Sequence, residues 1–546
     1  MTVHSLSVGA IDSLGANARV PVITAYLSFV AVVLLWLLMS AATEIENPES
    51  FYVAGRSLSP SFNGIAIAGE SITVLTLLGF SGNITLSGYD GFSVAIDILL
   101  ALGVLLFLAQ RIRNSGRYSL GDLFSLRAAG SGPCIAGNLV TLAITIPLLM
   151  VQLHAAGVST ALLIGLDSTH SQIVCTVLMG GFVTCVASAG GLRGTSLMHI
   201  VKVFFAIAVL VVIAVLSLSS FGWDPGRLLL TAVEKSAVPD KYLTPGFWKY
   251  SQDFKLGPLN TISNHAVLIL GVAMMPHLIL RINASRNGRS ARRSVAVAAV
   301  PLGMFVLLLI AVGFAAAAVV GGKNTGMADL FGPSFLISLA SGLVSNGSAA
   351  GVALITAIAC VVFLALITSV ASITFAAAVS LVHDLQARGE RRRTSGTEVR
   401  SVRIAAVVVG ATGVLLSAVT HKYPLEFLSS FSLCVAASCI FPPLIYSFFW
   451  VRFNRRGLLW SVYGGLLLCV MLTVFSPTVS GKPFSLFPEG HFDWYPLQSP
   501  GLVSIPAAFF LGWLGSQKAE TSPAPDFRYI EHQALTGNEA GLRADT

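Results

Sequence analysis

Residues 61–91 read SFNGIAIAGESITVLTLLGFSGNITLSGYDG, an apolar stretch long enough to cross a membrane. Its middle holds the carboxylate of Glu70, flanked by Gly69 and Ser71 and followed shortly by Thr73. A carboxylate at bilayer depth is costly unless it faces a polar cavity or a partner. Irregular backbone at that depth is tolerated only where it is buried in protein or lines a cavity. The stretch therefore predicts either a broken helix that forms a binding site, or a kinked helix whose Glu70 pairs with another helix.

The composition is that of a polytopic membrane protein. Of the 546 residues 55% are hydrophobic and only 11% are charged, whereas a soluble protein has about 25% charged residues. The mean hydropathy is +0.80. The seven cysteines fall in or beside apolar runs without a C-x-x-C pair, so we interpret them as buried apolar side chains. No phosphate-binding loop or His-Glu-x-x-His motif is present, so we expect no enzyme and no cofactor.

Apolar runs of about 20 residues predict thirteen membrane-spanning helices. The Lys and Arg residues predict their orientation, because most of them become cytoplasmic if the N-terminus lies outside. The excess of basic residues behind the net charge of +8 is then explained by their position in cytoplasmic loops, so we expect no nucleic-acid partner. The expected location is the cytoplasmic membrane, with the lipid bilayer as partner. The predicted spans are 22–42, 62–86, 92–110, 133–162, 171–189, 196–220, 259–280, 294–320, 349–381, 402–419, 424–450, 457–476 and 499–515.

A second interrupted helix lies five spans after the first. The run 259–280 contains GVAMMPHLIL, in which Gly271 and Pro276 disturb the helix. Interrupted helices at corresponding positions of two halves indicate an inverted repeat with a binding site at the breaks. His277, beside this break, either contacts a substrate or bonds a neighbouring carbonyl. We therefore predict two repeats of five spans each, inserted in opposite directions.

A third polar feature is a set of hydroxyls in the run 349–381. Thr368, Ser369 and Ser372 fall near one helix face, and Thr374 follows them. Neutral oxygens suit a hard monovalent cation such as Na⁺, but Ser and Thr also join membrane helices to one another. In other spans, Asp97 and Lys202 either pair or reach the membrane surface.

The remaining segments complete a predicted layout. The outer loop, residues 221–258, is rich in aromatic residues and either caps the outer mouth or forms an interfacial belt. The polar C-terminal segment predicts a disordered cytoplasmic tail. In chain order the layout is an extracellular N-terminus (1–21), a peripheral helix (22–42), a first repeat (62–220), the outer loop (221–258), a second repeat (259–450), two peripheral helices (457–515) and the tail (516–546).

From about residue 51 to residue 513 the sequence resembles the sodium:solute symporter family, specifically its cation/acetate permease branch. This resemblance implies two inverted five-helix repeats of the leucine-transporter type within thirteen helices. It also implies a Na⁺ site made by carbonyls of Gly69 and Ile72 and hydroxyls of Thr368 and Ser369. The segments that carry it are VAGRSLSP, GFSGNITLSGYDGF, RNSGRYSLGDLFSLR, GGLRGTS, GVAMMPHLILRI with the following ARRSV, HDL at 383–385, VAASCIFPPLIYSFFW and FSPTV.

The expected function is Na⁺-driven symport of a small monocarboxylate, with acetate the leading candidate. H⁺ coupling stays open, because Glu70 beside an anionic substrate would be repulsive unless protonated, paired or bound to a cation. Pyruvate, propionate and proline are alternative substrates, and a transporter-like sensor is an alternative class. The expected substrate-binding residues are Glu70, Ser71, Thr73, Gln152, Met274, Met275 and His277.

Overall fold

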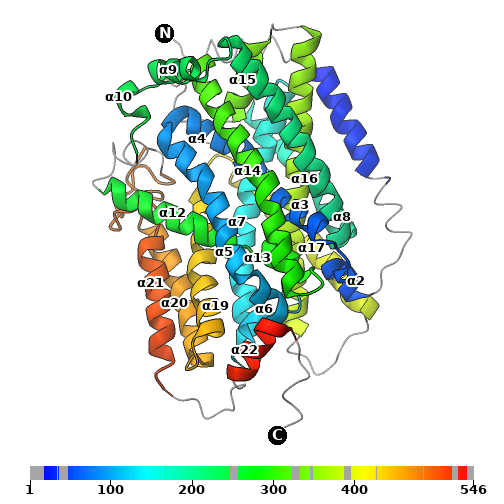
Figure 1. Cartoon of the computed structure of the whole chain (residues 1–546), viewed down its shortest axis with the longest axis vertical. Coiled ribbons are helices and arrows are strands. Elements are labelled where there is room, and N and C mark those ends of the chain that lie inside the picture. The colour runs from blue at the N-terminus through cyan, green and yellow to red at the C-terminus, as the bar shows by residue number, and fades with distance from the viewer. Residues whose placement is uncertain are drawn as a thin grey trace.

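The computed structural model describes residues 18–33, 35, 47–128, 130–166, 168–245, 256–321, 333–344, 348–386, 395–425, 427–483, 485–518 and 527–537. Apart from two isolated β-bridges, these residues form helices and the segments that connect them (Figure 1). Among them, nine helices are long and apolar enough to cross a membrane, or ten if one bent pair counts as a span. The prediction of an all-α polytopic membrane protein is therefore confirmed, while the total of thirteen spans stays a prediction.

The predicted spans fall on the helices of this bundle, except that the part of span 22–42 after residue 35 lies outside the described residues. Two of them, 171–189 and 196–220, lie in one helix that bends at Gly191, whose φ of 54° favours glycine. The membrane helices are Ala18–Val33, α3 (Pro60–Ser71), the π-helical η2 (Leu75–Gly79), α4 (Phe80–Ser87), α5 (Tyr89–Ser115), α7 (Ser131–Leu163), α8 (Thr169–Ser220), α12 (Gly257–Ala273), α13 (Pro276–Asn283), α14 (Gly288–Val319), α16 (Ala349–Gln386), α17 (Ser395–Val419), α18 (Phe427–Cys439), α19 (Phe441–Phe449), α20 (Arg455–Val474) and α21 (Gly501–Gly515).

The packing partners repeat between the two halves of the bundle. Helix α3 packs against α14, and its counterpart α12 packs against α5, the counterpart of α14. Likewise α7 packs against α18, and its counterpart α16 packs against α8. Each packing contact thus occurs twice. A helix of one half contacts a helix of the other half, and their counterparts make the same contact, as two structurally equivalent repeats require. The two interrupted helices, α3–α4 and α12–α13, occupy equivalent positions in this scheme.

Short helices cover the two ends of the bundle. At one end lie α9 (Pro225–Lys235), α10 (Pro239–Tyr242) and α15 (Pro333–Leu343) (Figure 1). Toward the other end lie α2 (Pro48–Val53), η1 (Ala54–Arg56) and α6 (Leu120–Phe124). The Tyr242 hydroxyl donates to the carbonyls of Ile84, at 2.8 Å, and Thr85, at 3.1 Å. The described part of the outer loop therefore packs onto α4 as a cap would.

The prediction of a disordered tail is wrong for one segment. Residues Phe527–Thr536 form α22, which packs against α5 and buries Ile530 and Ala534. Its backbone is held by side chains of α5, since Gln110 donates to the Leu535 carbonyl at 2.9 Å and Asn114 to that of Ala534 at 3.0 Å. Polar composition predicted disorder, but two apolar residues spaced by four give a short helix a face to bury.

Candidate functional site

The first interrupted helix breaks directly after Glu70 and Ser71. Helices α3 and η2–α4 meet at an angle of 58°, and residues 72 and 73 are not helical. The break is stabilised by threonine hydroxyls. Thr73 N–H donates to Thr76 Oγ1 at 2.8 Å, Thr76 N–H donates to Thr73 Oγ1 at 3.1 Å, and the Thr76 hydroxyl donates to the Ser71 carbonyl at 2.8 Å. The π-helical turn that follows is a feature often found at functional sites.

The predicted cation ligands on this helix lie at the break. The Gly69 carbonyl accepts the Ile72 N–H at 3.1 Å and keeps a second lone pair, and Ile72 is itself the buried residue after which the chain bends. A Cβ at Gly69 would lie 2.8 Å from the Cβ of His199, so only glycine allows α3 and α8 to approach this closely.

The second interrupted helix breaks at Met274 and Met275, between α12 and α13. Both methionines are buried, and Pro276 begins α13 as its first residue. His277 follows, also buried, and its Nδ1 atom has no hydrogen-bond partner among the described residues. The predicted break is therefore present.

The hydroxyls of α16 divide into bonded and unbonded groups. The Thr368 hydroxyl donates to the Leu364 carbonyl at 2.7 Å, which leaves its oxygen lone pairs available. Ser369 is 2% exposed, and its hydroxyl has no partner among the described residues. On α7, which packs against α16, Gln152 is buried and its Oε1 atom likewise lacks a partner there.

Glu70 is paired rather than free. Its carboxylate forms a buried ion pair with Arg281 near the end of α13 and lies 3.3 Å from His199 Nε2 on α8. Arg281 Nη1 also donates to the Ser196 hydroxyl at 2.8 Å. We call Glu70, Arg281, His199 and Ser196 the ion-pair cluster. The pairing of Glu70 with another helix is thus present together with the broken helix, and a role of Glu70 in binding stays a prediction.

His199 connects the first break to the hydroxyls of α16. Its Nε2 atom lies 3.0 Å from the Ser372 hydroxyl, one helical turn from Thr368 and Ser369. The same ring contacts Glu70 and lies beside Gly69. His199 thus connects α3 and α16, the two helices that carry the predicted cation ligands, through Glu70 and Ser372, which are not themselves among those ligands.

The residues that sequence reasoning missed are Arg281 and Thr76. Arg281 directly follows the predicted span 259–280 and therefore falls in the predicted cytoplasmic loop after it, although it lies four residues after His277 on the same helix face.

Lys202 also differs from expectation, because it is fully buried and its amine has no hydrogen-bond partner among the described residues. It neither reaches the membrane surface nor pairs with Asp97, which instead bonds His265.

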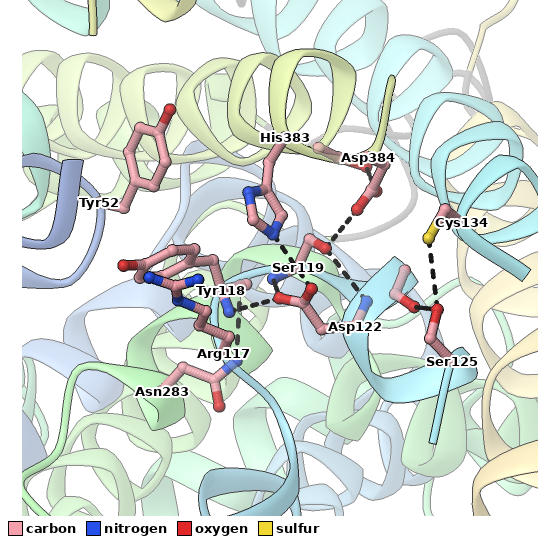
Figure 2. Close-up of polar contacts among 12 residues, drawn as sticks. Tyr52, Arg117, Tyr118, Ser119, Asp122, Ser125, Cys134, Asn283, His383 and Asp384 are labelled. Atoms are coloured by element: carbon pink, nitrogen blue, oxygen red, sulfur yellow. Dashed lines mark hydrogen bonds and ion pairs between the residues drawn. The ribbon is translucent and has the colours of Figure 1, made fainter. Parts of the chain in front are cut away.

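A second polar cluster joins α6 to the end of α16. Asp122 accepts hydrogen bonds from the Tyr118 N–H, at 2.7 Å, and lies 3.0 Å from His383 Nε2, while Ser119 bonds Asp384 (Figure 2). Burial raises the pKa of Asp122, but His383 and the backbone amides outweigh it, so the pKa lies below its ordinary value. We call Ser119, Asp122, His383 and Asp384 the inner cluster.

A groove of about 660 Å³ lies elsewhere, on the peripheral helices. It is lined only by residues of α20 and α21, so it belongs to neither interrupted helix. Its lining residues are Arg455, Arg456, Leu459, Trp460, Tyr463, Gly464 and Leu511.

Comparisons with known sequences agree on one family. The model of the Sodium:solute symporter family matches residues 51–465. The Monocarboxylic acid transporter of Corynebacterium glutamicum is 32% identical over 532 residues, covering 94% of this chain and 94% of that protein. Uncharacterized symporter YwcA of Bacillus subtilis is 32% identical over 521 residues, covering 94% of this chain and 98% of that protein.

Comparisons with solved structures agree on the fold. A Na⁺-coupled sialic acid symporter in a substrate-bound, outward-open state has a TM-score of 0.71 at 12% identity, covering 93% of this chain and 98% of that one. MhsT in complex with L-phenylalanine has a TM-score of 0.53 at 14% identity, covering 84% and 99%. At such identities the likeness shows the fold alone, and it confirms the leucine-transporter type.

Proposed function

The chain belongs to the sodium:solute symporter family, and on that basis we propose that it couples inward Na⁺ movement to uptake of a small monocarboxylate. Acetate is the first substrate to test. The relative from Corynebacterium glutamicum, named for monocarboxylic acids, supports this substrate class. One Na⁺ entering across 100 mV supplies about 2.3 kcal/mol before any concentration gradient is counted.

The observation that supports the proposal is that His199 contacts both Glu70 at the end of α3 and Ser372 of α16, the two helices that carry the proposed cation ligands. We propose that carbonyls of Gly69 and Ile72 and hydroxyls of Thr368 and Ser369 bind Na⁺. The buried hydroxyl of Ser369 has no partner among the described residues, which supports a ligand role, since such groups are normally hydrogen-bonded.

The substrate would lie between the two breaks. Helix ends at a break present unpaired N–H groups, which suit an anion. Because Arg281 neutralises Glu70, a carboxylate can approach without facing an unpaired negative charge. The proposed contacts are Glu70, Ser71, Thr73, Gln152, Met274, Met275 and His277, with Glu70 acting through its ion pair.

We place the protein in the cytoplasmic membrane with the N-terminus outside. In this orientation α6 and α22 lie on the cytoplasmic side and α9, α10 and α15 lie outside, at the opposite end of the bundle (Figure 1). The basic loops then obey the positive-inside rule.

The test is uptake of labelled acetate into proteoliposomes under an inward Na⁺ gradient, a matched K⁺ gradient and an inward proton gradient. We expect Na⁺ to stimulate uptake. Thr368→Ala combined with Ser369→Ala should raise the Na⁺ concentration for half-maximal uptake by roughly tenfold, because the site loses two oxygen ligands. The matched control is Thr231→Ala with Thr412→Ala, which removes two hydroxyls whose hydrogen bonds stay within their own helices, α9 and α17.

Each other outcome selects an alternative. Stimulation by protons alone would replace Na⁺ coupling with H⁺ coupling. Uptake of pyruvate, propionate or proline in place of acetate would change the substrate and keep the mechanism. Binding without uptake under any gradient would favour a sensor.

A further inference from the structure

The deepest unexplained charge in the bundle is that of Lys202. Its side chain is 0% exposed, and its Nζ atom has no hydrogen-bond partner among the described residues. Lysine is almost never fully buried unless it is paired, and an unpaired buried ammonium is strongly disfavoured. A lysine that is fully buried without a resident partner suggests a partner that binds and dissociates.

The place of Lys202 follows from its helix. It lies three residues after His199 on α8 and therefore on the same face, which is the face turned toward α3 and α16. Through His199, which lies 3.3 Å from Glu70, this face also borders the ion pair between Glu70 of α3 and Arg281 of α13. Helix α16 contributes hydroxyls to this region and no charge.

The charges in this region do not balance. Glu70 and Arg281 neutralise one another, so a protonated Lys202 leaves one positive charge in excess. Arg281 donates through Nε and Nη1, but its Nη2 atom has no partner among the described residues. Two buried nitrogen donors of cationic side chains are thus unused in the same region. A single carboxylate, with two acceptor oxygens, would satisfy both donors and cancel the excess charge.

We propose that Lys202 and Nη2 of Arg281 form the receptor for the carboxylate of the transported substrate. This inference rests on the proposed function and names the substrate class of that site as small monoanions. Neutral amides of the same shape are rejected because they leave the Lys202 charge unbalanced. Glu70 acts as a positioning residue, since it fixes the Arg281 guanidinium so that Nη2 stays free. The anion reaches these buried donors when the two halves move against each other.

The test is binding rather than transport. The full-length protein is purified, and its unfolding temperature and its affinity for labelled acetate are measured in wild type, Lys202→Met, Lys202→Arg and the surface control Lys241→Met. We expect acetate, propionate or pyruvate to raise the unfolding temperature of the wild type and acetamide to have no effect. Lys202→Met should weaken acetate binding by roughly 30-fold or more, because one partner of a buried charge pair is lost.

Stability separates this role from a structural one. Without ligand, Lys202→Met should unfold at the wild-type temperature or above, because the methionine removes an unpaired charge and breaks no bond. Lys202→Arg should retain part of the affinity, and Lys241→Met all of it. The inference is overturned if Lys202→Met binds acetate as the wild type does, or if no carboxylate stabilises the wild type. Carboxylate binding that depends on Lys202 without gradient-driven uptake would support the receptor and remove the symporter proposal.

Discussion

At the scale of single residues, the decisive finding is that Glu70 has a resident partner. A carboxylate in an apolar stretch needs a polar cavity or a partner, and Arg281 on α13 supplies the partner. Sequence alone left this open, because the two residues lie 211 positions apart and Arg281 seemed to begin a loop. The ion pair joins the two interrupted helices, so it fixes the position of one break relative to the other.

Breaking this pair should be costly. Arg281→Met leaves Glu70 buried without its ion-pair partner, and removing one partner of a buried ion pair costs about 3–5 kcal/mol. We expect a clear drop in the unfolding temperature of the purified protein. The double variant Arg281→Met with Glu70→Gln should regain much of the loss, because residue 70 then carries no charge that has lost its partner. Arg289→Met, at an exposed position of α14, is the control. An unchanged unfolding temperature in Arg281→Met would show that the pair contributes nothing.

At the scale of elements, apolar run length predicted the helices well and their ends less well. Helix α15 has 11 residues, too few to cross a membrane, and it lies between the predicted spans 294–320 and 349–381. The backbone of Gly191 is not helical, so the predicted spans 171–189 and 196–220 are two helical segments that meet at a kink within α8. The breaks themselves were predictable, since Gly and Pro inside an apolar run disrupt the ladder of backbone hydrogen bonds. The chemistry that stabilises each break was not, because it depends on side-chain geometry.

Thr76 illustrates this chemistry. Its hydroxyl serves the Thr73 N–H and the Ser71 carbonyl, two backbone groups that the break deprives of helical partners. Thr76→Val keeps the shape and removes the hydroxyl, so it should destabilise the protein by about 1–3 kcal/mol. It should also weaken Na⁺-dependent uptake, because the carbonyls at the break lose their fixed direction. Thr412→Val on α17 removes a hydroxyl that bonds only within its own helix, and we expect it to behave like the wild type. Equal uptake in the two variants would contradict this role for Thr76.

At the scale of the whole molecule, alternating access requires each end of the bundle to close and reopen. The inner cluster ties α6 to the end of α16 (Figure 2). His383 also faces Glu398 of α17, with 3.9 Å between Nδ1 and Oε1. Three elements that lie far apart in the sequence therefore meet through a few charged and polar groups. Contacts of this kind close one end firmly and yet separate without exposing a large apolar surface.

Asp122 is the residue on which this closure depends. Because its pKa is lowered in the folded protein, its contribution is present above the ordinary value of about 4 and is lost as the pH falls through the lower, folded value. Asp122→Asn imitates that loss at neutral pH. With the exposed Cys185 replaced by Ala, maleimide should label Cys134, beside α6, about tenfold faster in Asp122→Asn, because the weakened hydrogen bonds let this end open more often. The control Asp240→Asn lies at the opposite end and should leave the rate unchanged. If Asp122→Asn also left it unchanged, the inner cluster would hold α6 in place without controlling access.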